Sequence, residues 1–340
     1  MNFQKSIIPF TRVIFSLIFL LAFSQCKKPD RSALIVNPAF TEKIAAFTSG
    51  VISSESVIQV ILAEDYPGGD ISGAPSGDGL FRFKPAIRGQ AVWVDKRTIE
   101  FRPSQKLPSG ENYSGKFFLS KILQVPKEIA VLEFSFSVVE QEFTVEIEGY
   151  QSHNENDLVW NRISGTVNTA DVIDTELLGK YFSAKQDNRN LTINWEAGSD
   201  RRSFAFTVDS VQRKESPASV EINWDGTPEF KHVKGNQQVE IPALSDYKVM
   251  DVKVVQQPEQ YIQLQFSDPV KKNQNFEGLI FLENNTSLEF SVAGNTIKVF
   301  PAARQTGDNK ITIRSGLVNI LGYGLKQDHV SIVSTEHLLC

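Results

Sequence analysis

Short runs in which apolar and polar residues alternate recur along the chain, and Gly, Pro or charged residues close each run. In the first third, these runs cover residues 57–62, 81–83, 91–94, 98–102, 113–119 and 131–139. Alternation with a period of two is typical of β-strands that bury one face. Six strands at this spacing predict a β-sandwich of about 100 residues. The segment 41–47 fits either a helical turn or a strand.

The same pattern continues through two further blocks. The second block has runs at 143–148, 158–167, 191–195, 204–208, 220–224 and 238–241, and the third at 249–255, 261–266, 279–282, 288–292, 295–301, 310–314 and 330–333. Only 171–182 has helical spacing, and the turn 256–260 predicts an antiparallel hairpin. We therefore predict an all-β protein of three consecutive sandwiches. The expected division is a signal peptide at 1–25, a tether at 26–33, sandwiches at 34–140, 141–245 and 246–336, and a tail at 337–340.

One β-unit occurs twice. Thr98–Pro103 reads Thr-Ile-Glu-Phe-Arg-Pro, and Thr296–Pro301 reads Thr-Ile-Lys-Val-Phe-Pro. Each copy is followed by a Gly-acid-Asn turn, at 110–112 in the first copy and at 307–309 in the second. A strand that stops at proline and resumes through a glycine turn is one supersecondary unit. We expect it to be the same late strand of the first and third sandwiches, which favours a modular binding or scaffold protein over an enzyme.

The first 25 residues belong to a different physical regime. Lys5 and Arg12 precede an apolar run at 13–23, which is too short to cross a bilayer as a helix and reads as a signal peptide. The residues Phe-Ser-Gln that precede Cys26 resemble the lipobox of bacterial lipoproteins, which implies that Cys26 is acylated and holds the chain on a lipid bilayer. The implied location is the outer membrane of a Gram-negative bacterium, on the periplasmic face or the cell surface. Ordinary signal cleavage after Ser24 is the alternative.

Composition argues against catalysis. The chain has 24 Phe, only four His and two Cys, and a net charge of −5 without a basic stripe that could follow nucleic acid. The four histidines lie far apart, so we predict no catalytic residue, no metal and no cofactor. Glu146 and Glu148 are expected on a solvated strand face. The loop 67–79 is rich in glycine and acidic residues, and we favour a flexible connector there over a calcium site. We expect the strand tryptophans to lie in the core and not to form a sugar platform; they are Trp160, Trp195 and Trp224.

The third block resembles a known family. Its segment 265–270, Gln-Phe-Ser-Asp-Pro-Val, followed by Thr296–Pro301, looks like a bacterial Ig-like domain of large surface proteins. The first block is similar, through Trp93, Thr98–Pro103 and 110–113. Together with the lipobox, these blocks resemble the N-terminal region of bacterial alpha-2-macroglobulin-like lipoproteins.

That resemblance implies the scaffold of a membrane-tethered protease inhibitor, with proteases and downstream macroglobulin domains as partners. The sequence contains no Cys-x-Glu-Gln thioester motif, so trapping would need regions that are absent here. Because the sequence stops at Cys340 without a terminal helix or polar tail, one interpretation is that it is a fragment of a longer chain, with residues 337–340 at the truncation point. A surface adhesin or glycan-binding lipoprotein is the alternative function, and a hydrolase with an unreadable site is the third.

Overall fold

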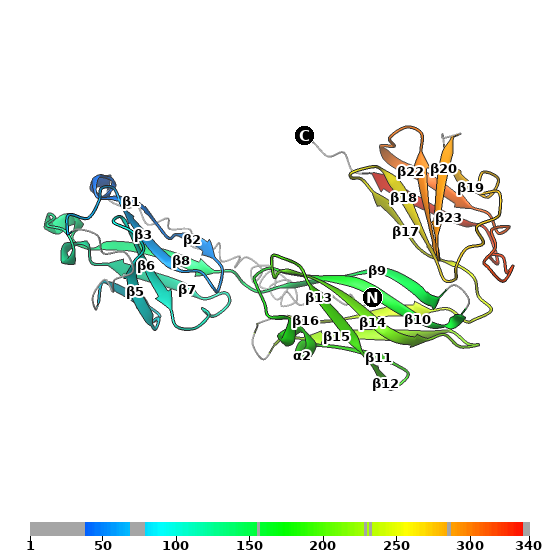
Figure 1. Ribbon diagram of the computed structural model, residues 1–340, viewed down its shortest axis with the longest axis horizontal. Helices are drawn as coiled ribbons and strands as arrows, with labels where there is room; N and C mark the ends of the chain where they lie inside the picture. The colour runs from blue at the N-terminus through cyan, green and yellow to red at the C-terminus, as the bar shows by residue number, and fades with distance from the viewer. Residues whose placement is uncertain are drawn as a thin grey trace, which may run out of the picture.

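The computed structural model describes residues 38–68, 79–154, 157–227, 230, 233–283 and 287–335, and most of them lie in β-strands. Figure 1 shows three β-sandwiches that follow one another along the chain, the first in blue and cyan, the second in green and the third in yellow to red. Each has its own hydrophobic core. The expectation of an all-β protein built from Ig-like sandwiches is confirmed.

The first sandwich packs two four-stranded sheets face to face. One has the order β1-β3-β6-β5 and the other β2-β8-β7-β4. Phenylalanine dominates the space between them, and the rings of Phe83 and Phe101 have centroids 4.8 Å apart. The strands are β1 (Ile44–Phe47), β2 (Gly50–Ile52), β3 (Ile58–Leu62), β4 (Phe81–Lys84), β5 (Gly89–Trp93), β6 (Thr98–Pro103), β7 (Asn112–Phe117) and β8 (Leu132–Val138). Three short 3-10 turns accompany them, η2 (Pro38–Glu42), η3 (Leu119–Lys121) and η4 (Lys127–Ile129).

The second sandwich has longer strands and a different order. Its sheets are β13-β14-β10-β9 and β12-β11-β15-β16. A seven-residue helix, α2 (Thr175–Tyr181), lies where helical spacing was predicted and buries Leu178. The strands are β9 (Phe143–Asn154), β10 (Asp157–Thr169), β11 (Phe182–Gln186), β12 (Arg189–Leu191), β13 (Ile193–Ala197), β14 (Ser203–Gln212), β15 (Ala218–Asp225) and β16 (Lys234–Ile241).

The third sandwich returns to the pattern of the first. Its larger sheet has the order β17-β18-β21-β20, and a three-stranded sheet, β19-β22-β23, covers it. The predicted hairpin is confirmed, because β17 pairs with β18 in antiparallel register around the turn. The strands are β17 (Val249–Val255), β18 (Tyr261–Phe266), β19 (Ile280–Leu282), β20 (Leu288–Ala293), β21 (Thr296–Pro301), β22 (Gly307–Ile313) and β23 (His329–Thr335).

The sequence repeat marks equivalent positions. β6 is the third strand of β1-β3-β6-β5, and β21 is the third strand of β17-β18-β21-β20. Both bury their second and fourth residues. The two turn glycines also agree, since Gly110 has φ +70° and Gly307 has φ +68°. Glycine reaches this left-handed region without the steric cost that a Cβ brings, so both turns require it.

Two expectations need revision. The segment 41–47 is neither purely helical nor purely extended, because η2 ends at Glu42 and β1 begins at Ile44. Of the three strand tryptophans, Trp195 and Trp224 pack against the second core as expected, but Trp160 is 39% exposed with the guanidinium of Arg189 over its ring. The core prediction for Trp160 was wrong because its position in β10 faces outward. Within the described part of the chain, no helix is long and apolar enough to cross a membrane.

Candidate functional site

The junction between the second and third sandwiches is built on one buried ion pair. Arg213 follows β14 and Asp268 follows β18, and both side chains are fully buried. The guanidinium of Arg213 donates to the carboxylate of Asp268. It also donates to four main-chain carbonyls that lie 2.7–3.3 Å away, those of Pro242, Ala243, Asp246 and Ser267. A buried charge persists only when it is paired and hydrogen-bonded in this way.

Side chains of the third sandwich also hold the edge of the second. Gln265 is buried, and its Nε2 donates to the carbonyl of Tyr150 at 2.8 Å. Asn295 donates to the same carbonyl. Lys253 Nζ donates to the carbonyl of Ile147 at 2.9 Å. Since β9 is the last strand of its sheet, these side chains satisfy carbonyls that no neighbouring strand can reach.

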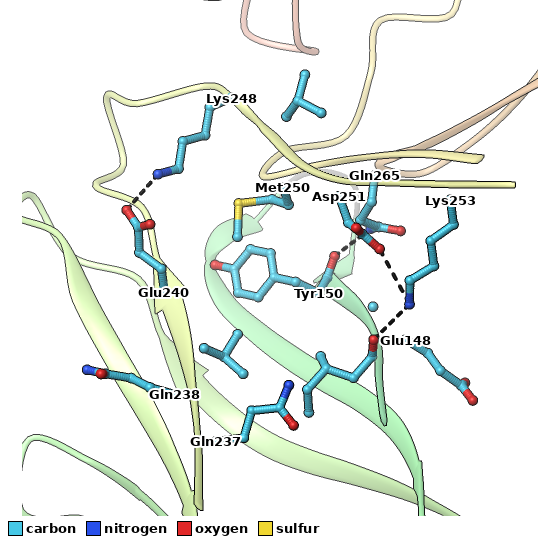
Figure 2. Close-up of a pocket in the computed structure, with 14 residues that line it drawn as sticks. Glu148, Tyr150, Gln237, Gln238, Glu240, Lys248, Met250, Asp251, Lys253 and Gln265 are labelled. Carbon is cyan, nitrogen blue, oxygen red and sulfur yellow. Dashed lines mark hydrogen bonds and ion pairs between the residues drawn. The ribbon is translucent and has the colours of Figure 1, made fainter. Parts of the chain in front are cut away.

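A cleft of about 360 Å³ opens beside this junction. Figure 2 shows Gln237, Gln238 and Glu240 on one side of it and Met250, Asp251 and Lys253 on the other, with the ring of Tyr150 between them. Three strands supply most of the lining, namely β9, β16 and β17. Each is the last strand of its sheet.

The charges in the cleft are mostly neutralised internally. Lys248 Nζ lies 2.6 Å from Glu240 Oε1, and Lys253 Nζ lies 3.4 Å from Asp251 Oδ2. Glu148 adds one carboxylate beyond these two pairs, so the lining keeps a small excess of negative charge beside its main-chain groups and amides.

Tyr150 contributes the one buried phenol of the cleft lining. Its side chain is almost fully buried, and its hydroxyl has no hydrogen-bond partner among the described residues. Burial raises the pKa of this phenol, so it stays protonated and able to donate at neutral pH. A buried polar group of this kind is costly unless a partner satisfies it.

The junction between the first and second sandwiches uses exposed charges instead. Glu55, Lys106, Asp174 and Arg201 form a closed ring in which each charge contacts two of the opposite sign, at distances of 2.7–2.9 Å. Beneath the ring, the buried carboxylate of Asp171 accepts from the Ser54 amide at 2.6 Å. Burial opposes ionisation of Asp171, but hydrogen bonds from residues 53, 54 and 172 outweigh it and lower the pKa.

The residues singled out from sequence stand as follows. Cys26, Cys340 and most of the loop 67–79 lie outside the described residues, so acylation of Cys26 and the preference for a flexible connector over a calcium site stay predictions. Glu146 and Glu148 are exposed on β9, as expected. The described residues hold no group of three or more His, Cys, Asp or Glu side chains that could bind a metal.

Sequence reasoning missed the residues that build the junction. Asp268 was noticed only as part of a strand-end motif, and Arg213 lies in an Arg-Lys-Glu run that looks like an ordinary turn. The main-chain carbonyls of Ile147 and Tyr150 cannot be recognised from the sequence, because every residue has one. Pairs separated by 55 or more positions become visible only when the domains are placed side by side.

Comparison with known proteins gives only distant structural likenesses. No protein-family model and no curated protein matches the chain. Among solved structures, the full ectodomain (Ig1–Ig3) of mouse nectin-like molecule 4 is 15% identical and covers 86% of this chain and 99% of that chain, with a TM-score of 0.25. Domains 4–9 of the surface layer protein SbsC are 11% identical and cover 87% of this chain and 48% of that chain, with a TM-score of 0.31.

A third likeness is the Bacteroides ovatus SGBP-B of a mixed-linkage glucan utilization locus, in complex with a heptasaccharide. It is 10% identical and covers 86% of this chain and 66% of that chain, with a TM-score of 0.26. Likenesses with TM-scores this low carry no argument about this chain. The class that the structure itself defines is a multidomain β-sandwich protein of Ig-like type whose second and third domains meet at a buried ion pair.

Proposed function

We propose that this chain is a membrane-tethered scaffold that holds Ig-like domains in a fixed arrangement and acts by binding, not by catalysis. The observation that carries the proposal is the buried pair of Arg213 and Asp268. Its two ends come from different sandwiches, and it is fully enclosed. A pair that is so costly to bury makes sense where one orientation of two domains must persist.

The proposed location is the outer membrane of a Gram-negative bacterium, with the acylated Cys26 as anchor. Two or three acyl chains, as bacterial lipoproteins carry, would hold the chain stably, whereas a single chain binds membranes only marginally. Metabolic labelling with an alkyne analogue of palmitate tests this. The wild-type protein should be labelled and sediment with membranes, and Cys26→Ser should lose both properties. Labelling of Cys26→Ser at the wild-type level would refute the anchor.

The scaffold itself is tested by double electron–electron resonance. Spin labels at Glu196 on β13 and Glu289 on β20 report the separation of the second and third sandwiches, after Cys26 and Cys340 are changed to Ser. Both labelled side chains are exposed. We expect one narrow distance distribution in the wild type and a broader one in Arg213→Met. A broad distribution in the wild type would contradict the fixed arrangement.

The finer role of this scaffold remains the one that the sequence resemblance implies, part of an alpha-2-macroglobulin-like protease inhibitor, with proteases as partners. That role predicts that the complete protein forms a stable complex with a protease of broad specificity after cleavage. A glycan array tests the alternative of a glycan-binding adhesin on the same preparation. Glycan binding without protease capture would replace the inhibitor role and leave the scaffold proposal intact.

A further inference from the structure

The cleft beside the Arg213 junction brings together the free edges of three sheets. β9 ends one sheet of the second sandwich, β16 ends the other, and β17 ends the larger sheet of the third. All three line the same cleft. In an edge strand, every second residue turns its N–H and C=O away from its only neighbour, where another strand can pair with them.

The three edges are not equally available. Side chains of the third sandwich already satisfy the outward carbonyls of Ile147 and Tyr150 on β9. On β17, the side chain of Lys253 reaches across to β9, where its Nζ donates to the carbonyl of Ile147. β16 keeps the most open edge. Among the described residues, the only hydrogen bond or ion pair that links its side chains to the third sandwich is the one between Glu240 and Lys248, near its C-terminal end.

β16 also lacks the devices that normally protect an edge. Natural sheets guard their edges with charges, prolines or very short strands. β16 is eight residues long and contains no proline, and its charges lie only at Lys234 and Glu240. The five residues between them are Gly-Asn-Gln-Gln-Val, and their side chains are exposed or half-buried. The stretch 237–240 that lines the cleft would pair with about four peptide residues over roughly 14 Å.

The chemistry of the walls fits a peptide better than a sugar. Sugar sites present the open face of an aromatic ring, but the one aromatic residue that lines this cleft, Tyr150, is almost fully buried and offers no such face. Val239 and Met250 are half-buried and provide apolar contacts for alternate side chains of a strand. Figure 2 shows the phenol of Tyr150 directed toward the side of the cleft that Glu240 forms, and its buried oxygen makes it part of the wall.

We propose that this cleft binds an extended, uncharged segment of a partner protein, which adds as a strand to the edge of β16. Main-chain hydrogen bonds to β16 supply the affinity, and the apolar contacts with Val239 and Met250 select small apolar residues at alternate positions. The inference goes beyond the scaffold role, because the cleft would bind its peptide whether or not Cys26 is acylated.

The experiment uses a random library of displayed peptides, about twelve residues long, selected on the full-length chain. The best peptide is synthesised with a fluorophore, and its binding is followed by anisotropy. A second set carries N-methyl groups at single positions, which remove one main-chain donor each. We expect N-methylation at alternate positions to weaken binding about tenfold and at the positions between to change it less than about twofold.

A matched pair of variants locates the peptide. Gln238→Lys places a charge on the exposed edge of β16, and Ser291→Lys places the same charge on β20, the opposite edge of the third sandwich's larger sheet. We expect a loss of about tenfold or more for the first and less than about twofold for the second. Circular dichroism verifies that both variants fold.

Three outcomes would overturn the proposal. The first is that the selection yields no peptide with a dissociation constant below about 1 mM. The second is that the effects of N-methylation show no alternation, or that Gln238→Lys binds like the wild type. The third is that an oligosaccharide from a glycan array, or a second copy of the chain, binds the wild-type protein and loses its binding in Gln238→Lys.

Discussion

The substitution Arg213→Met tests the junction between the second and third sandwiches most directly. It keeps an unbranched, apolar side chain in place but removes the guanidinium. Four main-chain carbonyls then lose a donor, and the carboxylate of Asp268, which is fully buried, loses its counter-charge. Leaving each buried carbonyl unsatisfied costs about 1 kcal/mol or more, and breaking a buried ion pair from one side costs about 3–5 kcal/mol. These costs overlap, so we expect a loss of about 3–5 kcal/mol.

Equilibrium unfolding in urea measures this loss. Trp195 and Trp224 lie against the second core, so their fluorescence follows the domain that carries Arg213. The control is Lys248→Met, which breaks the solvent-accessible pair with Glu240 at the same junction. Exposed pairs are worth about 0–1 kcal/mol, so the control should stay within that range of the wild type.

The double variant of Arg213→Met and Asp268→Asn sharpens the test. Each single variant leaves one charge buried without a partner, whereas the double variant leaves neither. We therefore expect the double variant to be less destabilised than the sum of the two single variants. The reasoning would be refuted if Arg213→Met had a free energy of unfolding within about 1 kcal/mol of the wild type. It would also be refuted if the losses of the two single variants added up to that of the double variant.

Three further predictions concern other parts of the chain. At the first junction, the pKa values of Asp171 and Asp174 lie below the ordinary 3.8. The contacts of these carboxylates are therefore fully present above pH 3.8 and are lost as the pH falls below it. Small-angle scattering should show the first sandwich reorienting in acid but not at neutral pH. Gly307→Ala should destabilise the protein by about 1–2 kcal/mol, because a Cβ at φ +68° is strained. Gly179→Ala in α2, where a Cβ meets nothing within 4 Å, should stabilise it by about 0.5–1 kcal/mol. Thermal unfolding distinguishes the two signs. Trp160→Ala should lower the free energy of unfolding by less than about 1 kcal/mol and remove the fluorescence component that iodide quenches. A loss of about 3–5 kcal/mol, which is typical of a core tryptophan, would show that the ring is buried.

The fold was readable from the sequence because its signals are local. Alternation identified the strands, and the repeated Thr98–Pro103 and Thr296–Pro301 segments identified equivalent positions in two sandwiches. Trp160 was misplaced because an aromatic residue in a strand does not reveal which face of the sheet it lies on. The outer face became known only from the packing of the two sheets, which leaves Trp160 on the exposed side of β10 and outside the second core.

The cleft could not be read in the same way, because it consists of relations between segments. Nothing in the sequence distinguishes Gln237 and Gln238 from other polar strand residues. They become candidates for binding only because two other edge strands, β9 and β17, line the same cleft. Main-chain carbonyls, such as those of Ile147 and Tyr150, carry no residue-specific signal. Only the buried charge gave a usable hint, since Asp268 lies at the end of an apolar strand where an acidic residue is expensive to bury.

The two junctions use opposite electrostatic strategies, and the difference has mechanical consequences. The ring around Glu55 and Arg201 is partly exposed, with side chains 31% and 46% accessible, so water and salt compete with its contacts. The pair of Arg213 and Asp268 is enclosed, so neither salt nor solvent reaches it. We therefore expect the first junction to be the softer of the two, and the second and third sandwiches to move as one body. The edges that line the cleft belong to that body, so their spacing should stay fixed when the first sandwich changes its angle.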